Sequence, residues 1–299
     1  MPEYDPITRK LVLNDGDEIP FTNAPNLDQV RDMHEQIRAN MRRGLPMLKK
    51  EGQKNGTLII VGGGPSVAKD EALIREMYKT PGNRVLCLND SHDWLIERGI
   101  RPWGLVFWEV ASMKGIIRFT QPGHPKNYVR YLLASQSWPD LFDALKGFNV
   151  LVWHARQESP GESELYLELD PKGFNIGGGC SALLRSINIG GQVMGFSKVH
   201  LFGADSSYDP ITGQTHAYYN MRGYDPSYDP IDVKLPDGTQ WATSYYLARQ
   251  ARDFNSCVIQ WEDFRKKTGK GMDITVHGEG LLPQMAKMLG LHASQKGVK

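Results

Sequence analysis

Five consecutive residues, Gly62-Gly63-Gly64-Pro65-Ser66, follow the apolar run LIIV directly and precede a segment that favours a helix. Glycines at such a turn let backbone N–H groups approach a ligand closely. The start of the helix adds unpaired donors and a partial positive charge, which together bind phosphate. The motif is not a Walker loop, because no GK[ST] follows, and Pro65 and Val67 depart from GxGxxG. We expect these amides to bind a nucleotide phosphate; the alternative is a tight turn without a ligand.

A polar pair, Asn89-Asp90, ends the next apolar run, and Ser91 follows it. In doubly wound sheets, ligands lie beyond the carboxyl ends of the strands, where such side chains can bind ribose or base. Asn, Asp and Ser are also good helix N-caps, so capping is an equal alternative. Glu109, at the end of the third expected strand, has the same two interpretations.

A second glycine-rich segment, GFNIGGGCS at residues 173–181, precedes another expected helix. The amides of Gly178 and Gly179 and the hydroxyl of Ser181 are candidate donors to a phosphate, a carboxylate or a base. A plain loop is the alternative.

Acid–base chemistry is indicated by Asp205 in the motif GADSS and by His216 in QTHAYY. Asp205 can ligate Mg²⁺ or act as a base, and His216 can act as a general acid or base or contact phosphate. A histidine in a loop is more often solvated or packed without a catalytic role. In the motif VHGEG, His277 and Glu279 would face one edge of the sheet, unless this segment is only a capped turn.

The candidate residues lie at the ends of expected strands. From Thr57 onward, short β-branched runs alternate with amphipathic segments, which is the rhythm of right-handed βαβ units. We therefore expect an α/β, Rossmann-like, doubly wound and mostly parallel sheet. The expected organisation is an N-terminal arm and helix (1–55), a nucleotide-binding domain (56–292) and a tail (293–299).

Three segments lack periodicity. The first 25 residues are expected to form an extended arm, and residues 158–172 a polar, acidic loop. Residues 206–240 are rich in Tyr, Pro and Gly, and we expect a long ordered loop that acts as a lid.

The composition limits the classes of partner. Lys plus Arg (35) balances Asp plus Glu (34), so the net charge of +1 does not indicate nucleic acid or an anionic membrane. The three cysteines, Cys87, Cys180 and Cys257, are widely spaced and suggest neither disulfides nor a thiolate zinc site. With no apolar run near bilayer length and no signal-like start, we expect a cytoplasmic protein.

The motifs, in this order, resemble the MptE-like 6-hydroxymethylpterin diphosphokinase family. The resemblance covers roughly residues 26–292 and includes TLIIVGGGPS, LCLND, GIRPWGLVFWE, FGAD, THA and VHGEG. The architecture is also similar to that of bacterial sialyltransferases that bind CMP-sialic acid. Positions that match the sialyltransferase pattern are Gly62, Gly64, Pro65, Ser66, Asn89, Ser181 and Asp205. The resemblance implies that these residues surround a nucleotide.

Departures from the two families bear on the substrate. Pro102-Trp103 and Trp108-Glu109 replace the Pro-Asp and the strand-end Asp usual in the diphosphokinases, and Gly63 replaces an Asn of the sialyltransferases. The first hypothesis is a diphosphokinase-like transferase that uses ATP or GTP, with Mg²⁺ on Asp205 and a hydroxymethyl-type acceptor. The second is a metal-independent glycosyltransferase that uses a sugar nucleotide. The third is a non-catalytic nucleotide-binding or assembly protein. The acceptor and any homo-oligomer stay open.

Overall fold

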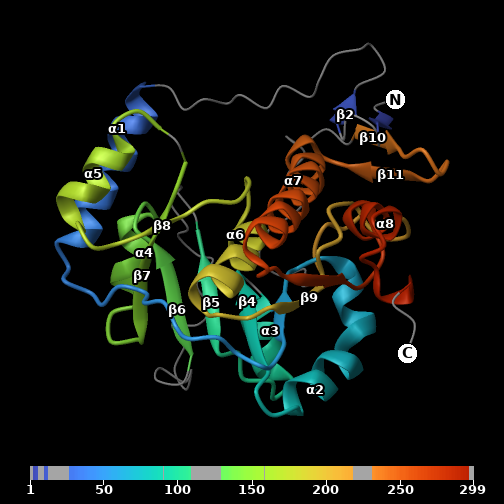
Figure 1. The fold of residues 1–299 in the computed structure, drawn as a ribbon, viewed down its shortest axis with the longest axis horizontal. Helices are drawn as coiled ribbons and strands as arrows, with labels where there is room; N and C mark the ends of the chain where they lie inside the picture. The colour runs from blue at the N-terminus through green and yellow to red at the C-terminus, as the bar shows by residue number, and fades with distance from the viewer. Residues whose placement is uncertain are drawn as a thin grey trace.

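The protein is described from a computed structural model, which defines residues 3–5, 10–12, 27–89, 91–108, 129–157, 159–217 and 231–295. Its centre is an eight-stranded sheet in which every neighbouring pair of strands is parallel (Figure 1). This arrangement confirms the expected α/β, Rossmann-like fold. The strands are β3 (Leu58–Val61), β4 (Arg84–Leu88), β5 (Gly104–Phe107), β6 (Arg130–Ala134), β7 (Val150–Ala155), β8 (Asn175–Ile176), β9 (Lys198–Phe202) and β12 (Asp273–Val276).

The strand order is β12-β9-β3-β4-β5-β6-β7-β8. From β3 the chain builds the sheet outward in one direction as far as β8, and then returns to place β9 on the other side of β3. The direction of winding therefore reverses between β3 and β9. In open parallel sheets, ligands bind beyond the carboxyl ends of the strands at such a switch point.

Helices cover both faces of the sheet because its strands are apolar on both sides. Leu58 and Ile60 pack with the helices of one face, and Ile59 and Val61 pack with those of the other. One face carries α6 (Ala182–Asn188), α7 (Tyr245–Thr268) and α8 (Leu281–Met288), and the other carries α2 (Glu71–Lys79), α3 (Ser91–Glu97) and α4 (Pro139–Ala144). Among the described helices, even the long α7 is too polar to cross a bilayer.

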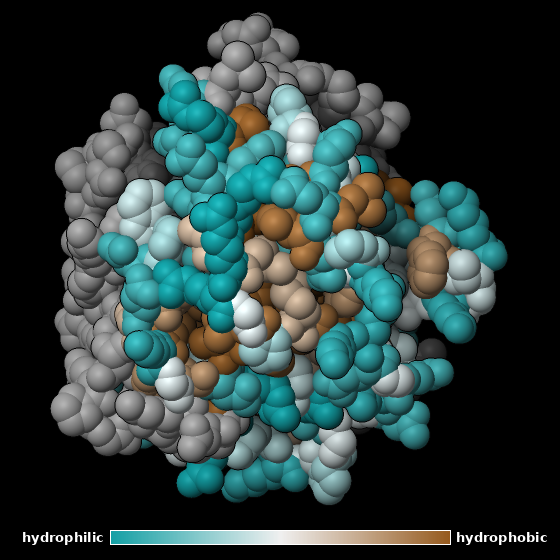
Figure 2. All heavy atoms as spheres, turned by 90° about the vertical axis from the view of Figure 1, so that its left-hand side faces the viewer, coloured by the Kyte–Doolittle hydropathy of each residue, from teal (hydrophilic) through white to brown (hydrophobic). Residues whose placement is uncertain are grey.

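A helix occupies the segment that was expected to be an acidic loop. The loop prediction for residues 158–172 is wrong, because α5 (Glu162–Leu169) lies there and packs against α1 (Leu27–Met41). Leu165 and Tyr166 are buried against Met33 and Ile37, and Leu169 packs beside them, so a few apolar side chains among acidic ones dock this short helix. Figure 2, which looks onto this side, shows hydrophobic residues at the centre of the face with hydrophilic ones around them.

A second, four-stranded sheet forms from the expected extended arm and from residues in and directly after the expected lid loop. Its order is β11-β10-β1-β2, from β1 (Glu3–Asp5), β2 (Lys10–Val12), β10 (Ile231–Lys234) and β11 (Gln240–Thr243). The prediction of one continuous loop over residues 206–240 is therefore wrong for its second part, while residues 218–230 lie outside the described ranges. Asp237-Gly238, with Gly238 at φ +86°, makes the tight turn between β10 and β11 and was the available signal.

Candidate functional site

The turn after β3 is joined to the end of β9 by backbone hydrogen bonds. The Gly62 amide donates to the Phe202 carbonyl at 2.8 Å, and the Gly64 amide donates to the Gly203 carbonyl, also at 2.8 Å. The two glycine-containing motifs are thus brought together at the switch point. These contacts explain why the loops are short and glycine-rich: a Cβ on Gly62 would lie 2.6 Å from the Gly203 oxygen.

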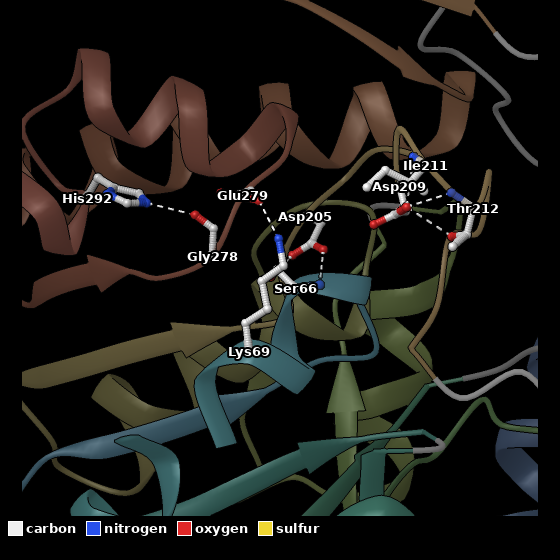
Figure 3. Close-up of polar contacts among 9 residues, drawn as sticks. All are labelled: Ser66, Lys69, Asp205, Asp209, Ile211, Thr212, Gly278, Glu279 and His292. Carbon is white, nitrogen blue, oxygen red and sulfur yellow. Dashed lines mark hydrogen bonds and ion pairs between the residues drawn. The ribbon is translucent and has the colours of Figure 1, made fainter. Parts of the chain in front are cut away.

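The side-chain carboxylate of Asp205, from the loop after β9, lies at the N-terminal end of the short 3₁₀-helix η1 (Pro65–Asp70). The Ser66 amide donates to Asp205 Oδ2 at 2.7 Å, and the Ser66 hydroxyl donates to Asp205 Oδ1 at 2.5 Å (Figure 3). From the sequence we expect this amide to face a phosphate, but in the structure the anion on it is a carboxylate of the same chain. The role of residues 62–66 in binding a nucleotide stays a prediction.

Three glycines leave the space that this buried contact needs. A Cβ on Gly64 would lie 2.6 Å from Asp205 Cγ, and a Cβ on Gly278 would lie 2.1 Å from Ser66 Oγ. Gly280, at φ +138°, brings its Cα so close that a Cβ would lie 2.5 Å from the Asp205 carbonyl oxygen. The motif VHGEG therefore shapes the environment of Asp205 from the β12 side.

The charge of Asp205 is only partly compensated. Burial raises its pKa to about 6, although both hydrogen bonds from Ser66 favour the charged form. The nearby Asp70 carboxylate raises the pKa further and the Lys69 ammonium lowers it. Asp70 is itself half-buried, and burial raises its pKa as well. Asp205 therefore holds a proton more readily than an exposed aspartate does.

Lys69 and Glu279 form an ion pair beside this carboxylate. Their Nζ and Oε2 atoms are 2.7 Å apart, and both side chains are exposed. Figure 3 shows the Lys69 ammonium between Glu279 and Asp205. The same view shows Asp209, whose carboxylate accepts from the amide and hydroxyl of Thr212 and closes a local turn. Lys69 is a site residue that sequence reasoning missed; its place in the first helical turn after GGGPS was the available signal.

His216 lies against the glycine turn, as its candidate role requires. A Cβ on Gly63 would lie 2.7 Å from His216 Cδ2, and the Ala217 amide donates to the Gly63 carbonyl at 2.8 Å. The imidazole is exposed, and its Nδ1 lies 2.8 Å from the Thr215 hydroxyl oxygen. The structure therefore brings Gly63, Asp205 and His216 to one end of the sheet.

Asn89 directly follows β4 and has a left-handed backbone conformation. Its φ is +45°, and its Oδ1 is buried without a hydrogen-bond partner among the residues that the structure describes. Ser91 connects the two strand ends, because its hydroxyl donates to the Val61 carbonyl at 2.7 Å and accepts from the Leu88 amide at 2.8 Å. Asp90 and Glu109 lie outside the described residues.

The second glycine-rich segment leads into α6. Gly178 and Gly179 have φ of +115° and +73°, and Ser181 caps the helix by accepting from the Leu184 amide at 3.5 Å. The Asn188 side chain donates to the Gly177 carbonyl at 2.8 Å, and a Cβ on Gly178 would lie 2.2 Å from Asn188 Nδ2. These glycines are thus required for packing, and their role in ligand binding stays a prediction.

His277 faces the sheet rather than the Asp205 carboxylate. Its ring stacks on Phe202 at 4.0 Å, and its Nε2 lies 2.8 Å from Nδ1 of His200. Within the described ranges, no three Asp, Glu, His or Cys side chains come together as metal ligands. Without such a group, and with Ser66 donating to both oxygens of Asp205, the described residues do not form the oxygen cage that Mg²⁺ prefers.

No protein-family model matches the chain, and no curated protein matches it. Among solved structures, the MAf glycosyltransferase from Magnetospirillum magneticum AMB-1 matches with a TM-score of 0.60 at 14% identity, over 91% of this chain and 39% of that one. The chain thus spans about two fifths of the length of that protein. At this identity the likeness shows the fold: the chain has a fold that is also found in a glycosyltransferase.

A mammalian sialyltransferase, solved in complex with Gal-beta-1-3GalNAc-ortho-nitrophenol, matches at 13% identity over 69% of this chain and 75% of that one. Its TM-score of 0.30 is too low to bear on the fold. Neither structure shows the diphosphokinase family that the motifs resemble.

Proposed function

We propose that the protein is a glycosyltransferase that uses a sugar nucleotide without a resident metal ion. The observation that carries the proposal is the position of His216, an exposed imidazole held against Gly63 at the switch point of the sheet. The fold shared with the MAf glycosyltransferase supports it. The same comparison gives no support to the diphosphokinase alternative.

The geometry suggests separate roles for the two candidate residues. His216 is accessible from solvent and takes the proton from the acceptor hydroxyl. The acceptor oxygen then bonds to the anomeric carbon of the donor, whose bond to the phosphate oxygen breaks. The nucleotide leaves with that electron pair. Asp205 is 4% exposed and engages Ser66 with both oxygens, so it positions the turn beneath the reaction.

An unpaired atom of Asn89 supports the proposal that the sugar donor is a nucleotide. Buried polar atoms are nearly always hydrogen-bonded, and an orphaned acceptor indicates a missing donor group. The Oδ1 of Asn89 is such an acceptor among the described residues, at the end of the strand next to β3. A ribose hydroxyl or an exocyclic amine of the base would satisfy it.

Ligand-induced stabilisation tests the proposal directly. Thermal unfolding is followed with ATP, GTP, UDP-sugars, CMP-sugars and S-adenosylmethionine, each with and without Mg²⁺. We expect at least one sugar nucleotide to raise the Tm equally in Mg²⁺ and in EDTA. Stabilisation by ATP that requires Mg²⁺ would support the diphosphokinase hypothesis instead. No shift with any compound would favour a non-catalytic protein.

His216→Gln separates catalysis from binding. With a stabilising sugar nucleotide and water as acceptor, release of the nucleotide is expected to fall about 100-fold or more, because a positioned general base contributes 10²–10⁴-fold. The Tm shift caused by the donor should remain. His34→Gln on α1 is the matched control and should retain full turnover. Unchanged turnover in His216→Gln would contradict the assigned role.

A further inference from the structure

Arg185 is a buried arginine without a carboxylate partner among the described residues. It lies on α6 and is 4% exposed. Its Nη1 donates to the Ile176 carbonyl, its guanidinium carbon lies 4.5 Å from the centre of the Trp108 ring, and its Nε is buried without a hydrogen-bond partner. Within the described ranges, no Asp or Glu forms an ion pair with it.

This environment is costly for a positive charge. Burial lowers the pKa of Arg185 to about 10, and the more distant carboxylates of Glu162 and Asp253 only partly oppose that effect. Buried charges in folded proteins are normally paired, because their desolvation is expensive. The chain thus holds a buried guanidinium that no carboxylate of the described residues contacts directly.

The position of Arg185 indicates a ligand. Ile176 ends β8 and Trp108 directly follows β5, so the guanidinium lies at the carboxyl ends of parallel strands, where ligands of this fold class bind. The helix that carries Arg185 packs against β3, β4 and β5 (Figure 1). Arg185 therefore belongs to the same end of the sheet as Asn89.

The unsatisfied atoms also indicate the chemistry of the ligand. Arg185 Nε and Trp108 Nε1 are donors, and both are buried without an acceptor in the described part of the chain. Asn89 Oδ1 is an acceptor without a donor there, at the end of the strand that pairs with β5. The two donors, one of them charged, would be satisfied by an oxyanion of the ligand. The single acceptor would be satisfied by a hydroxyl or amine of the ligand.

We propose that Arg185 and Trp108 form an anion subsite that binds a phosphate or carboxylate group of the ligand, with Asn89 accepting from a neighbouring hydroxyl or amine. The subsite deepens the proposed function and rests on it, because the anion would be a phosphate of the sugar nucleotide or the carboxylate of an acidic sugar. Arg suits this role better than Lys, since its planar fork matches both groups.

Calorimetric titration with matched probes tests the subsite. Inorganic pyrophosphate, UDP and uridine report on a phosphate, and glucuronate and glucose report on a carboxylate. We expect the charged member of one series to bind and its neutral counterpart to bind far more weakly. In Arg185→Met the Kd should rise about tenfold or more, because a charge-assisted hydrogen bond is lost. Trp108→Phe should weaken binding less, and Arg31→Met on the exposed surface of α1 should not change it.

A thermal scan without ligand separates a binding role from a structural one. A subsite arginine predicts that the Tm of Arg185→Met is not lower than that of the wild type, because a buried charge that Glu162 and Asp253 only partly compensate is removed. A structural arginine predicts a clear loss of Tm, which would overturn the proposal. Arg185→Lys is the second variant: it keeps the charge but lacks the fork, and its Kd for the anion should also rise.

The outcomes distinguish this subsite from the proposed function. Binding of pyrophosphate or glucuronate that depends on Arg185, without binding of any sugar nucleotide, would retain the subsite and reject the glycosyltransferase. Binding of a sugar nucleotide with equal Kd in the wild type and both Arg185 variants would reject the subsite alone. Absence of binding by every anion would also reject it.

Discussion

Ser66 donates both its amide and its hydroxyl to the carboxylate of Asp205, and both residues are 4% exposed. The contact joins the turn after β3 to the loop after β9 at the point where the sheet reverses its winding. It gives a buried negative charge two donors, one of them at the positive end of a helical turn. The shape of the turn and the charge of Asp205 therefore depend on each other.

Ser66→Ala removes the hydroxyl donor and keeps the amide. We expect the free energy of unfolding at pH 7 to fall by about 1.5–3 kcal/mol, because a hydrogen bond to a buried charge is lost. Ser137→Ala is a matched control, since Ser137 is also buried but its hydroxyl has no hydrogen-bond partner among the described residues. It should change the stability by less than about 0.5 kcal/mol. Urea unfolding compares the two, and equal losses would argue against the contact.

Gly64→Ala places a methyl group where Asp205 lies. A Cβ there would be 2.6 Å from Asp205 Cγ, so the carboxylate or the turn must move. We expect a loss of about 1–3 kcal/mol, the usual cost of overpacking. Gly52→Ala is the control, because nothing lies within 4 Å of its added Cβ among the described residues. Denaturant unfolding of both variants provides the measurement, and a neutral Gly64→Ala would show that the turn is looser than described.

The buried Asp205 predicts a pH dependence of stability. Its pKa is about 6 in the folded protein against an ordinary value of 3.8 for an unfolded chain, so the folded state holds a proton that the unfolded state releases between these values. Its stabilising contribution is complete below pH 3.8 and is lost as the pH rises through 6, a difference of roughly 3 kcal/mol. Asp205→Asn lacks this loss, so its stability relative to the wild type should rise from pH 4 to pH 7. A constant difference across that range would contradict the raised pKa.

The stability that depends on His154 is expected to change with pH in the opposite direction. Burial lowers its pKa from 6.5 to about 4, although the Asp170 carboxylate favours the charged form. Its contribution to stability is complete above pH 6.5 and is lost as the pH falls towards 4. His154→Gln should therefore gain stability relative to the wild type from pH 7.5 down to pH 4.5. Chemical denaturation at both pH values checks this. A parallel change in Asp205→Asn and His154→Gln would contradict the two assignments.

The packing of α5 against α1 predicts how much stability is lost when a side chain between the two helices is shortened. Ile37 is 0% exposed in the cluster that Leu165 and Tyr166 complete. Ile37→Ala should lower the free energy of unfolding by about 2–5 kcal/mol. Leu167 is on the same helix pair but 65% exposed, and Leu167→Ala should remain within about 0.5 kcal/mol of the wild type. Thermal unfolding monitored by circular dichroism distinguishes the two. Similar losses would mean that α5 is not packed as described.

The parallel sheet could be predicted from the sequence because its strands are locally distinctive. Runs such as LIIV are buried on both faces, and each ends in glycines or polar residues. α5 could not be predicted from ESELYLEL alone, since only its contact with Ile37 identifies Leu165 and Tyr166 as core residues. β10 and β11 have four residues each, too few for a period to be recognised.

The glycine-rich turns of the candidate site could be recognised in the sequence, but the contacts that they make could not. Glycine-rich turns can be recognised from the residue type, because few other residues allow two backbone segments to approach so closely. That Asp205 would occupy the Ser66 amide depends on the placement of β9 beside β3, across 139 residues of sequence, which no local pattern specifies. Arg185 is the one charged residue of α6, and its lack of a contacting carboxylate among the described residues is visible only when its neighbours are in place.

The late position of β9 in the chain affects how the protein folds during its synthesis. During synthesis, β3 to β8 leave the ribosome before β9, so the backbone groups of LIIV on that side of β3 have no partner until residues 198–202 arrive. An apolar strand with an open edge is a template for pairing with other chains. The nascent protein therefore exposes this apolar edge for as long as its candidate site is unfinished, and docking of β9 ends both conditions at once.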